Sequence, residues 1–314
     1  MSKETKKIVV DSGKFATKAV LIKPDGKLKK LTFRTKMSET EETLVNTNET
    51  YAVHFNGGNY LVGRQATNSD WETSKSSNLH QLSIYTSIHQ FVNDGDSVDL
   101  IVGCPLSVYT KRKQREEYEQ IMKGDGDITI TVNEEKKTFR IDSIHAIPET
   151  SGYLFKHAIN YENKLFAVVD VGGLNANCCQ YMDGDILHGT DITLNMGMNT
   201  LYKNIQNSLN KEFSSNISLI QVEQIMKMPK ENREIKKDKE NSKKLIHKLT
   251  RQHVEGLKDA CIQNGWDVDN IEFIFVGGGS KALSEEVRYV FGDDVIISDN
   301  AVWDNAEGFA ELLK

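Results

Sequence analysis

The sequence contains no apolar run that approaches the roughly 18 residues of a membrane-spanning helix. It has only four cysteines and four prolines among 314 residues, which excludes disulfide-stapled and collagen-like classes. Basic residues are outnumbered, with 39 Lys and Arg against 45 Asp and Glu, and the net charge is −6. A protein that coats DNA by itself needs many basic residues to neutralise phosphates. We therefore expect a soluble globular protein that has no membrane partner and reaches DNA only indirectly.

Several common site signatures are also missing. The cysteines at positions 104, 178, 179 and 261 have no metal-ligand spacing, and the eight histidines form no HExxH or HxH cluster. No GxxxxGK[ST] phosphate loop occurs. The charged N-terminus runs into only three apolar residues, Ile8 to Val10, which is too short for a secretion signal. These features favour a cytoplasmic protein with reduced thiols.

An internal repeat organises the chain. Val9-Val10-Asp11-Ser12-Gly13 recurs as Val168-Val169-Asp170-Val171-Gly172, 159 positions later. In each copy an apolar strand leads into an Asp-x-Gly turn and a second strand follows, so both copies are predicted hairpins. We expect two domains, residues 1–160, to which residues 300–314 return, and residues 161–299.

The remaining pattern mixes strands and helices within each half. Further strands are predicted at residues 51–55, 59–62, 98–102, 128–132, 138–144, 271–276 and 295–298. Apolar residues at helical spacing predict helices over residues 199–210 and 243–261. The polar stretch 37–49 is expected to be a mobile loop, and the charged run 227–244 a solvated loop that leads into a helix. The fold class is therefore α/β.

The duplicated hairpin suggests a chemical role. One Asp-x-Gly turn alone is as well explained by a tight turn, whereas two copies at half-chain separation favour loops that face each other across a cleft. Each loop offers backbone N–H groups to phosphate oxygens and one carboxylate, Asp11 or Asp170, to a hydrated Mg²⁺.

Two other segments carry candidate residues. Gly277, Gly278 and Gly279 follow a predicted strand, and the loose GxGxxA match that begins there leaves too little chain for a dinucleotide-binding domain. A nucleotide contact within the second half fits better, with a helix beginning near Lys281. Glu149 follows a strand at Pro148 and precedes a helix; it is either a helix N-terminal carboxylate or a group that orients a water molecule for attack on a phosphate.

Together these segments resemble the actin-like ATPase superfamily, which includes the Hsp70 ATPase domain and sugar kinases. Asp11-Ser12-Gly13 with Lys18 is similar to the first phosphate motif, and Pro148-Glu149 to the first connecting motif. Asp170-Val171-Gly172-Gly173 is similar to the second phosphate motif. Residues 276–279 are similar to the adenosine motif, and Asn305-Ala306-Glu307-Gly308-Phe309 to the second connecting motif. The five motifs occur in family order. Within the superfamily, residues 102–109 resemble a Gly-x-Pro-Leu-Ser segment of ParM-type bacterial plasmid-segregation actins.

The resemblance implies an actin-like, ribonuclease H-like duplicated fold with two domains around a nucleotide cleft. It implies Asp11 and Asp170 as ligands of Mg²⁺ through water, and Glu149 as the residue that positions the attacking water. The implied nucleotide-binding residues are Ser12, Gly13, Lys18, Gly172, Gly173, Asn175, Gly277, Gly278 and Gly279. Glu223 and Lys227, one helical turn apart, are candidates for contact with the adenine base, and the alternative is that both are ordinary surface residues. Asn175 and Asn177 depart from the family, in which threonines and then a carboxylate are common.

The implied function is an ATPase, with GTP as an alternative nucleotide, that polymerises into cytoskeletal filaments. By the same resemblance, these filaments would segregate plasmid DNA through an adaptor protein. Two alternatives remain open: a sugar or acid kinase of the same superfamily, and a nucleotide-dependent scaffold that does not hydrolyse.

Overall fold

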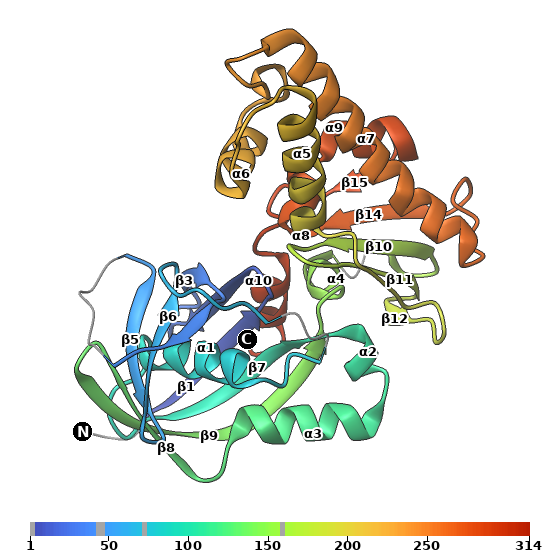
Figure 1. Cartoon of the computed structure of the whole chain (residues 1–314). Coiled ribbons are helices and arrows are strands. Elements are labelled where there is room, and N and C mark those ends of the chain that lie inside the picture. Colours follow the sequence, from blue (N-terminus) through green and yellow to red (C-terminus); the bar gives the residue numbers. More distant parts are fainter. Residues whose placement is uncertain (1–3, 42–47, 71–73, 158–160) are drawn as a thin grey trace. The chain divides into compact units, whose positions relative to one another are not determined.

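The chain divides into two compact units in a computed structural model that describes residues 4–41, 48–70, 74–157 and 161–314. Unit 1 comprises Met1–Ala158 and Trp303–Lys314, and unit 2 comprises Ile159–Val302. Figure 1 shows the last helix, in red, beside the blue and green strands of unit 1. Unit 2 is thus a continuous insertion into a unit that is built from both ends of the chain.

Unit 1 contains a nine-stranded mixed sheet in the order β3-β2-β1-β7-β9-β8-β5-β6-β4. Its strands are β1 (Thr5–Ser12), β2 (Ala16–Ile22), β3 (Leu28–Arg34), β4 (Met37–Glu39), β5 (Thr50–Phe55), β6 (Gly58–Gly63), β7 (Ser97–Cys104), β8 (Asp127–Val132) and β9 (Glu135–Pro148). Its helices are α1 (Asn78–His89), α2 (Leu106–Tyr109), α3 (Arg112–Lys123), α4 (Gly152–His157) and α10 (Asp304–Glu311).

The alternation of side chains along β1 determines how this sheet is covered. Ile8 and Val10 point to one face, where they join a core with residues of α1 and α3. Val9 points to the other face and packs with Phe309 of α10. Because both faces are covered, residues 8–10 of β1 are all apolar, and the carboxylate of Asp11 that follows them is buried too.

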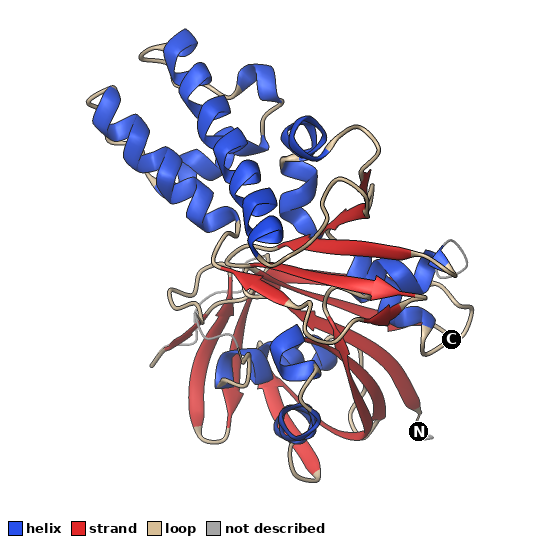
Figure 2. Cartoon of the chain, turned by 90° about the vertical axis from the view of Figure 1, so that its right-hand side faces the viewer, coloured by secondary structure: helices blue, strands red, loops and turns tan. Residues whose placement is uncertain are grey.

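Unit 2 has a smaller sheet with helices packed beside it, as Figure 2 shows. The sheet order is β12-β11-β10-β14-β15, and β13 pairs with β11. The strands are β10 (Leu165–Val171), β11 (Ala176–Met182), β12 (Asp185–Ile186), β13 (Ile192–Leu194), β14 (Glu272–Val276) and β15 (Ile296–Ile297). The helices are α5 (Met198–Glu212), α6 (Leu219–Lys227), α7 (Lys239–Gln263), α8 (Gly277–Ala282) and α9 (Ser284–Phe291), with a 3-10 turn at Lys230–Asn232.

Three expectations need correction. The stretch 37–49 is not all loop, because Met37–Glu39 forms β4 and pairs with β6; residues 42–47 lie outside the described part. The helix expected from about Lys281 begins at Gly277 as α8. The charged run 227–244 includes the buried Arg233, whose guanidinium donates to the carbonyl oxygens of Met228 and Ala282. Arg233 therefore ties the end of α6 to the end of α8.

Candidate functional site

Both Asp-x-Gly motifs form hairpin turns with the same register, which confirms the predicted pair of hairpins. Asp11 lies opposite Lys18 in the β1–β2 pair, and Asp170 lies opposite Asn177 in the β10–β11 pair. Each pairing leaves a turn of four residues, 13–16 and 172–175. In each turn the leading glycine lies against the carbonyl oxygen three residues later, so that an added Cβ would stand about 3 Å from it. The sequence repeat is therefore a repeat of local geometry.

The candidate site residues of unit 1, which we call the unit 1 half-site, surround Asp11. It is buried, and Lys18 Nζ donates to its Oδ2 at 3.1 Å. Burial alone would raise the pKa of Asp11, but Lys18 and Lys75, with hydrogen bonds from Lys18 and Asn305, hold it below its ordinary value. Gly103 lies so close that an added Cβ would be 3.0 Å from Asp11 Oδ1. Asp11 is thus an ionised carboxylate, and on one side only the backbone of Gly103 lies next to it.

Glu149 lies in the same unit, directly after β9. Its backbone N–H donates to the carbonyl oxygen of Cys104 at 3.1 Å, which places the start of the connecting segment beside the end of β7. Its carboxylate forms a buried ion pair with the ammonium of Lys75. A carboxylate with one oxygen held by a cation has a fixed orientation, and the other oxygen can accept a hydrogen bond from water.

The sequence did not single out Lys75, His80 or Asp70. Ser12 Oγ and His80 Nδ1 are 2.9 Å apart and buried, and His80 Nε2 lies 3.6 Å from Asp70 Oδ2. Burial and the nearby Lys75 lower the pKa of His80 to about 3, so the imidazole is neutral. Nδ1 of this neutral ring accepts from Ser12 when Nε2 carries the proton toward Asp70. A buried histidine fixes the hydroxyl of Ser12, and no local motif signals it.

The half-site in unit 2 is built on β10, β11 and the start of α5. Asp170 is buried near the end of β10. The first amides of α5 bind the turn: Met198 N–H donates to the carbonyl oxygen of Gly172, and Asn199 N–H to that of Gly173. Gly172 N–H itself donates to the carbonyl oxygen of Asn175 at 2.9 Å. The turn is therefore held by backbone bonds, and the side chain of Asn175 takes no part in them.

The three glycines after β14 lie beside this turn. Gly277 has a left-handed φ of +82°, and an added Cβ would stand 2.1 Å from Asp170 Oδ1. An added Cβ at Gly279 would stand 2.7 Å from the carbonyl oxygen of Val171. Gly278 has only Val302 Cγ2 near it, at 3.7 Å. The first and third glycines are thus required for packing around Asp170, and the middle one leaves its backbone open.

Glu223 and Lys227 lie one turn apart on α6 and bind each other. Lys227 Nζ is 3.0 Å from Glu223 Oε1, and the lysine side chain is 59% exposed. Their expected adenine contact stays a prediction, supported only by the link from α6 to α8 through Arg233.

A hydrated magnesium ion fits the donor chemistry of these residues. Asp11 supplies ionised carboxylate oxygen, which Mg²⁺ prefers, and Asp170 is a second buried carboxylate. Among the described residues no three His, Cys, Asp or Glu side chains cluster closely enough to hold a metal ion. Mg²⁺ keeps several of its waters in proteins, so it does not need such a cluster.

No helix in the described ranges is long and apolar enough to cross a membrane.

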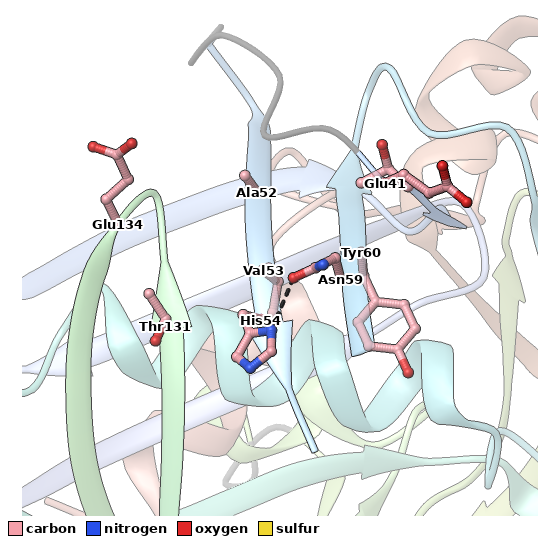
Figure 3. Close-up of a pocket in the computed structure, with 9 residues that line it drawn as sticks. Glu41, Ala52, Val53, His54, Asn59, Tyr60, Thr131 and Glu134 are labelled. Carbon is pink, nitrogen blue, oxygen red and sulfur yellow. Dashed lines mark hydrogen bonds between the residues drawn. The ribbon is translucent and has the colours of Figure 1, made fainter. Parts of the chain in front are cut away.

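A separate pocket of about 200 Å³ lies on the β5–β6–β8 part of the unit 1 sheet. Figure 3 shows Tyr60 and the hydrogen-bonded pair His54 and Asn59 on its wall, with Glu41 and Glu134 at its rim. None of the nucleotide-binding, metal-binding or catalytic residues predicted from the sequence lines this pocket. The pocket therefore does not belong to either half-site.

Comparison with protein families gives a match for each half of the chain. Residues 10–152 match the N-terminal domain of actin-like proteins, and residues 168–289 match the C-terminal domain of the archaeal actin homologue described as MreB-like. No curated protein matches the sequence.

Solved structures resemble the chain over almost its whole length. The Alp12 filament structure is 26% identical, with a TM-score of 0.72 over 99% of this chain and 98% of that one. The archaeal actin homologue Ta0583 in complex with ADP is 16% identical, with a TM-score of 0.76 over 98% and 99%. A 15-stranded ParM filament from Clostridium botulinum is 17% identical, with a TM-score of 0.77 over 98% and 99%. These likenesses confirm the expected two-domain α/β fold.

Proposed function

Because the chain belongs to the actin-like superfamily in both of its halves, we propose that it is an ATPase that assembles with copies of itself into cytoskeletal filaments. One observation carries the proposal: each unit presents a buried aspartate at the same register position of an Asp-x-Gly hairpin. A fold that repeats this pair of turns supplies two sets of backbone N–H groups and two carboxylates for a nucleotide and its magnesium ion.

Catalysis of phosphoryl transfer depends mainly on positioning and electrostatics, and these determine the role of each residue. Asp11 and Asp170 hold hydrated magnesium, which when bound neutralises charge on the phosphates. Lys18 and the N–H groups around Ser12, Gly13, Gly172 and Gly173 bind the phosphates. Glu149, fixed by Lys75, orients the attacking water. The backbone of Gly277 to Gly279, which is open at Gly278, accepts the ribose and the α-phosphate. Asn175, Glu223 and Lys227 are further candidate contacts.

We also propose that the filaments segregate plasmid DNA in the cytoplasm of a bacterium. Support comes from the relatives, since one similar structure is the AlfA filament from a Bacillus subtilis plasmid, with a TM-score of 0.66. The net charge of −6 opposes direct binding to the phosphate backbone, so an adaptor protein makes the DNA contact.

The test follows assembly and hydrolysis together. Light scattering and phosphate release are measured with ATP or GTP, with and without magnesium, and the product is viewed by electron microscopy. We expect filaments and phosphate release that both require magnesium. Asp170→Asn weakens nucleotide binding, while Asp183→Asn, at an exposed position in the turn between β11 and β12, serves as the control.

The outcomes separate the alternatives. Turnover only after a sugar or acid is added would indicate a kinase and contradict the proposal. Filaments that form with nucleotide but release no phosphate would indicate a scaffold. A wild-type chain that binds neither nucleotide would reject the whole assignment.

A further inference from the structure

Lys14 lies in the turn of the first hairpin, directly after Gly13, and no sequence motif called attention to it. Its Nζ is buried and makes no hydrogen bond within the described part of the chain. A buried ammonium group has three donors and loses its hydration, so leaving it without a partner is costly. The side chain nevertheless keeps this position beside the proposed phosphate-binding residues.

The carboxylates around Lys14 are already engaged by other groups. Glu149 is paired with Lys75, and Asp11 is paired with Lys18. Asp70 Oδ2 accepts from Ser77 Oγ and faces the ring of His80. Burial and repulsion by Lys75 lower the pKa of Lys14, and attraction to Glu149 and Asp70 opposes this only in part. Among the described residues, no group accepts a hydrogen bond from Lys14 Nζ, whereas Lys18 and Lys75 each pair with a carboxylate.

The neighbours of Lys14 indicate which anion would accept hydrogen bonds from its ammonium group. Lys14 lies within the electrostatic reach of Glu149, the residue proposed to orient the attacking water. The water attacks the terminal phosphate, so an anion that Lys14 can reach from there is the reacting end of the nucleotide. Charge-assisted hydrogen bonds from an ammonium to phosphate oxygen are among the stronger polar contacts in proteins.

We propose that Lys14 binds the terminal phosphate and thereby lets the site distinguish a nucleoside triphosphate from a diphosphate. This inference rests on the nucleotide binding proposed above. It adds a phosphate ligand that the actin-like motifs in this chain do not include, in a turn where Lys18 already serves the neighbouring carboxylate.

The test uses beryllium fluoride as a mimic of the terminal phosphate. Affinities for ADP, and for ADP with beryllium fluoride, are measured with magnesium for the wild-type chain and for Lys14→Met. We expect the variant to keep its ADP affinity and to lose about ten- to a hundredfold of the gain from beryllium fluoride, the range for a hydrogen bond to a charged group. Lys14→Arg should restore part of the gain. Lys27→Met is the matched control, since Lys27 lies in the turn between β2 and β3 with its side chain 79% exposed.

A second measurement separates ligand binding from a structural role. In the ligand-free protein, Lys14→Met removes a buried charge that has no hydrogen-bond partner, so the variant should melt at or above the temperature of the wild-type chain. A clear drop in melting temperature would overturn the inference, as would an unchanged gain from beryllium fluoride or an equal loss for both ligands. A wild-type chain that binds no nucleotide would overturn the proposed function along with it, whereas the other failures leave that function standing.

Discussion

Gly277 and Asp170 are in direct contact at the ends of the paired strands β14 and β10. An added Cβ at position 277 would stand 2.1 Å from Asp170 Oδ1. The glycine also has a left-handed φ of +82°. Gly277→Ala therefore combines backbone strain with displacement of the carboxylate. We expect the variant to bind ATP with magnesium more weakly, as measured by isothermal titration calorimetry, and to melt at a lower temperature.

Gly265→Ala is the control for this prediction. Gly265 has nearly the same φ, +80°, with nothing within 4 Å of an added Cβ, so it carries only the strain of roughly 1–2 kcal/mol. Equal effects of the two substitutions on ATP affinity would mean that the position of Asp170 does not depend on Gly277.

The crossing of α4 and α10 in unit 1 depends on Gly308. An added Cβ there would stand 1.7 Å from the carbonyl oxygen of Gly152, so Gly308→Ala forces the two helices apart. We expect a loss of about 3 kcal/mol, typical of overpacking, which for a domain of this size lowers the melting temperature by about 6 °C or more.

A second helical glycine provides the comparison for Gly308. At Gly256 in α7 an added Cβ would meet only the flexible end of Met196, at 2.8 Å. Gly256→Ala should therefore be nearly neutral or stabilising, because alanine favours the helix by roughly 0.5–1 kcal/mol. A Gly308 variant as stable as the wild-type chain would show that the crossing can relax.

Glu149→Gln tests the residue proposed to orient the attacking water. Glutamine keeps a hydrogen-bond acceptor for the buried Lys75, whereas alanine would leave that ammonium uncompensated at a cost of about 3–5 kcal/mol. Loss of a positioned acid–base group slows a reaction by about 10² to 10⁴. We expect phosphate release to slow by that factor while assembly with ATP persists in light scattering. Glu162→Gln, at an exposed position, is the control, and an unchanged rate in Glu149→Gln would reject the role.

His80 makes stability depend on pH in a defined direction. Its pKa falls from 6.5 to about 3 on folding, so between these values the unfolded chain binds more protons and the folded state loses stability as the pH falls. From about pH 7 to pH 5 this contributes a loss of about 2 kcal/mol, at roughly 1.4 kcal/mol per pKa unit below 6.5. The His80→Asn variant should lose less folding stability between pH 7 and pH 5 than the wild-type chain, as measured by thermal unfolding. Parallel pH profiles of the two proteins would contradict the prediction.

The sequence predicts the parts of the fold that have a strong local signal. Both hairpins around Asp11 and Asp170 follow from apolar strands that end in Asp-x-Gly, and α5 and α7 follow from apolar residues at helical spacing. The sequence does not predict β3, because it is a sheet-edge strand rich in exposed lysine. It predicts the start of α8 several residues too late, because three glycines begin this helix and glycine has poor helix propensity.

Some residues of the candidate site could be predicted from the sequence, and others could not. Asp11, Lys18 and Glu149 lie in recognisable motifs, and the structure brings them into one half-site of unit 1. His80 could not be predicted, because α1 is buried around most of its circumference and so has no amphipathic pattern. Lys75 lies just before α1, in a stretch that carries no motif. Their contacts with Glu149 and Ser12 also span 74 and 68 positions of sequence, which no local spacing encodes.

The insertion of unit 2 has a consequence for the order in which the chain becomes able to fold during synthesis. Unit 2 is one continuous segment, so all of its sheet and helices are available once residue 302 has left the ribosome. Unit 1 lacks Ala306, Phe309 and Ala310, which cover Val9, Val20 and Ile101, until the final helix is made. The half of the protein that is translated first is therefore the half that is completed last.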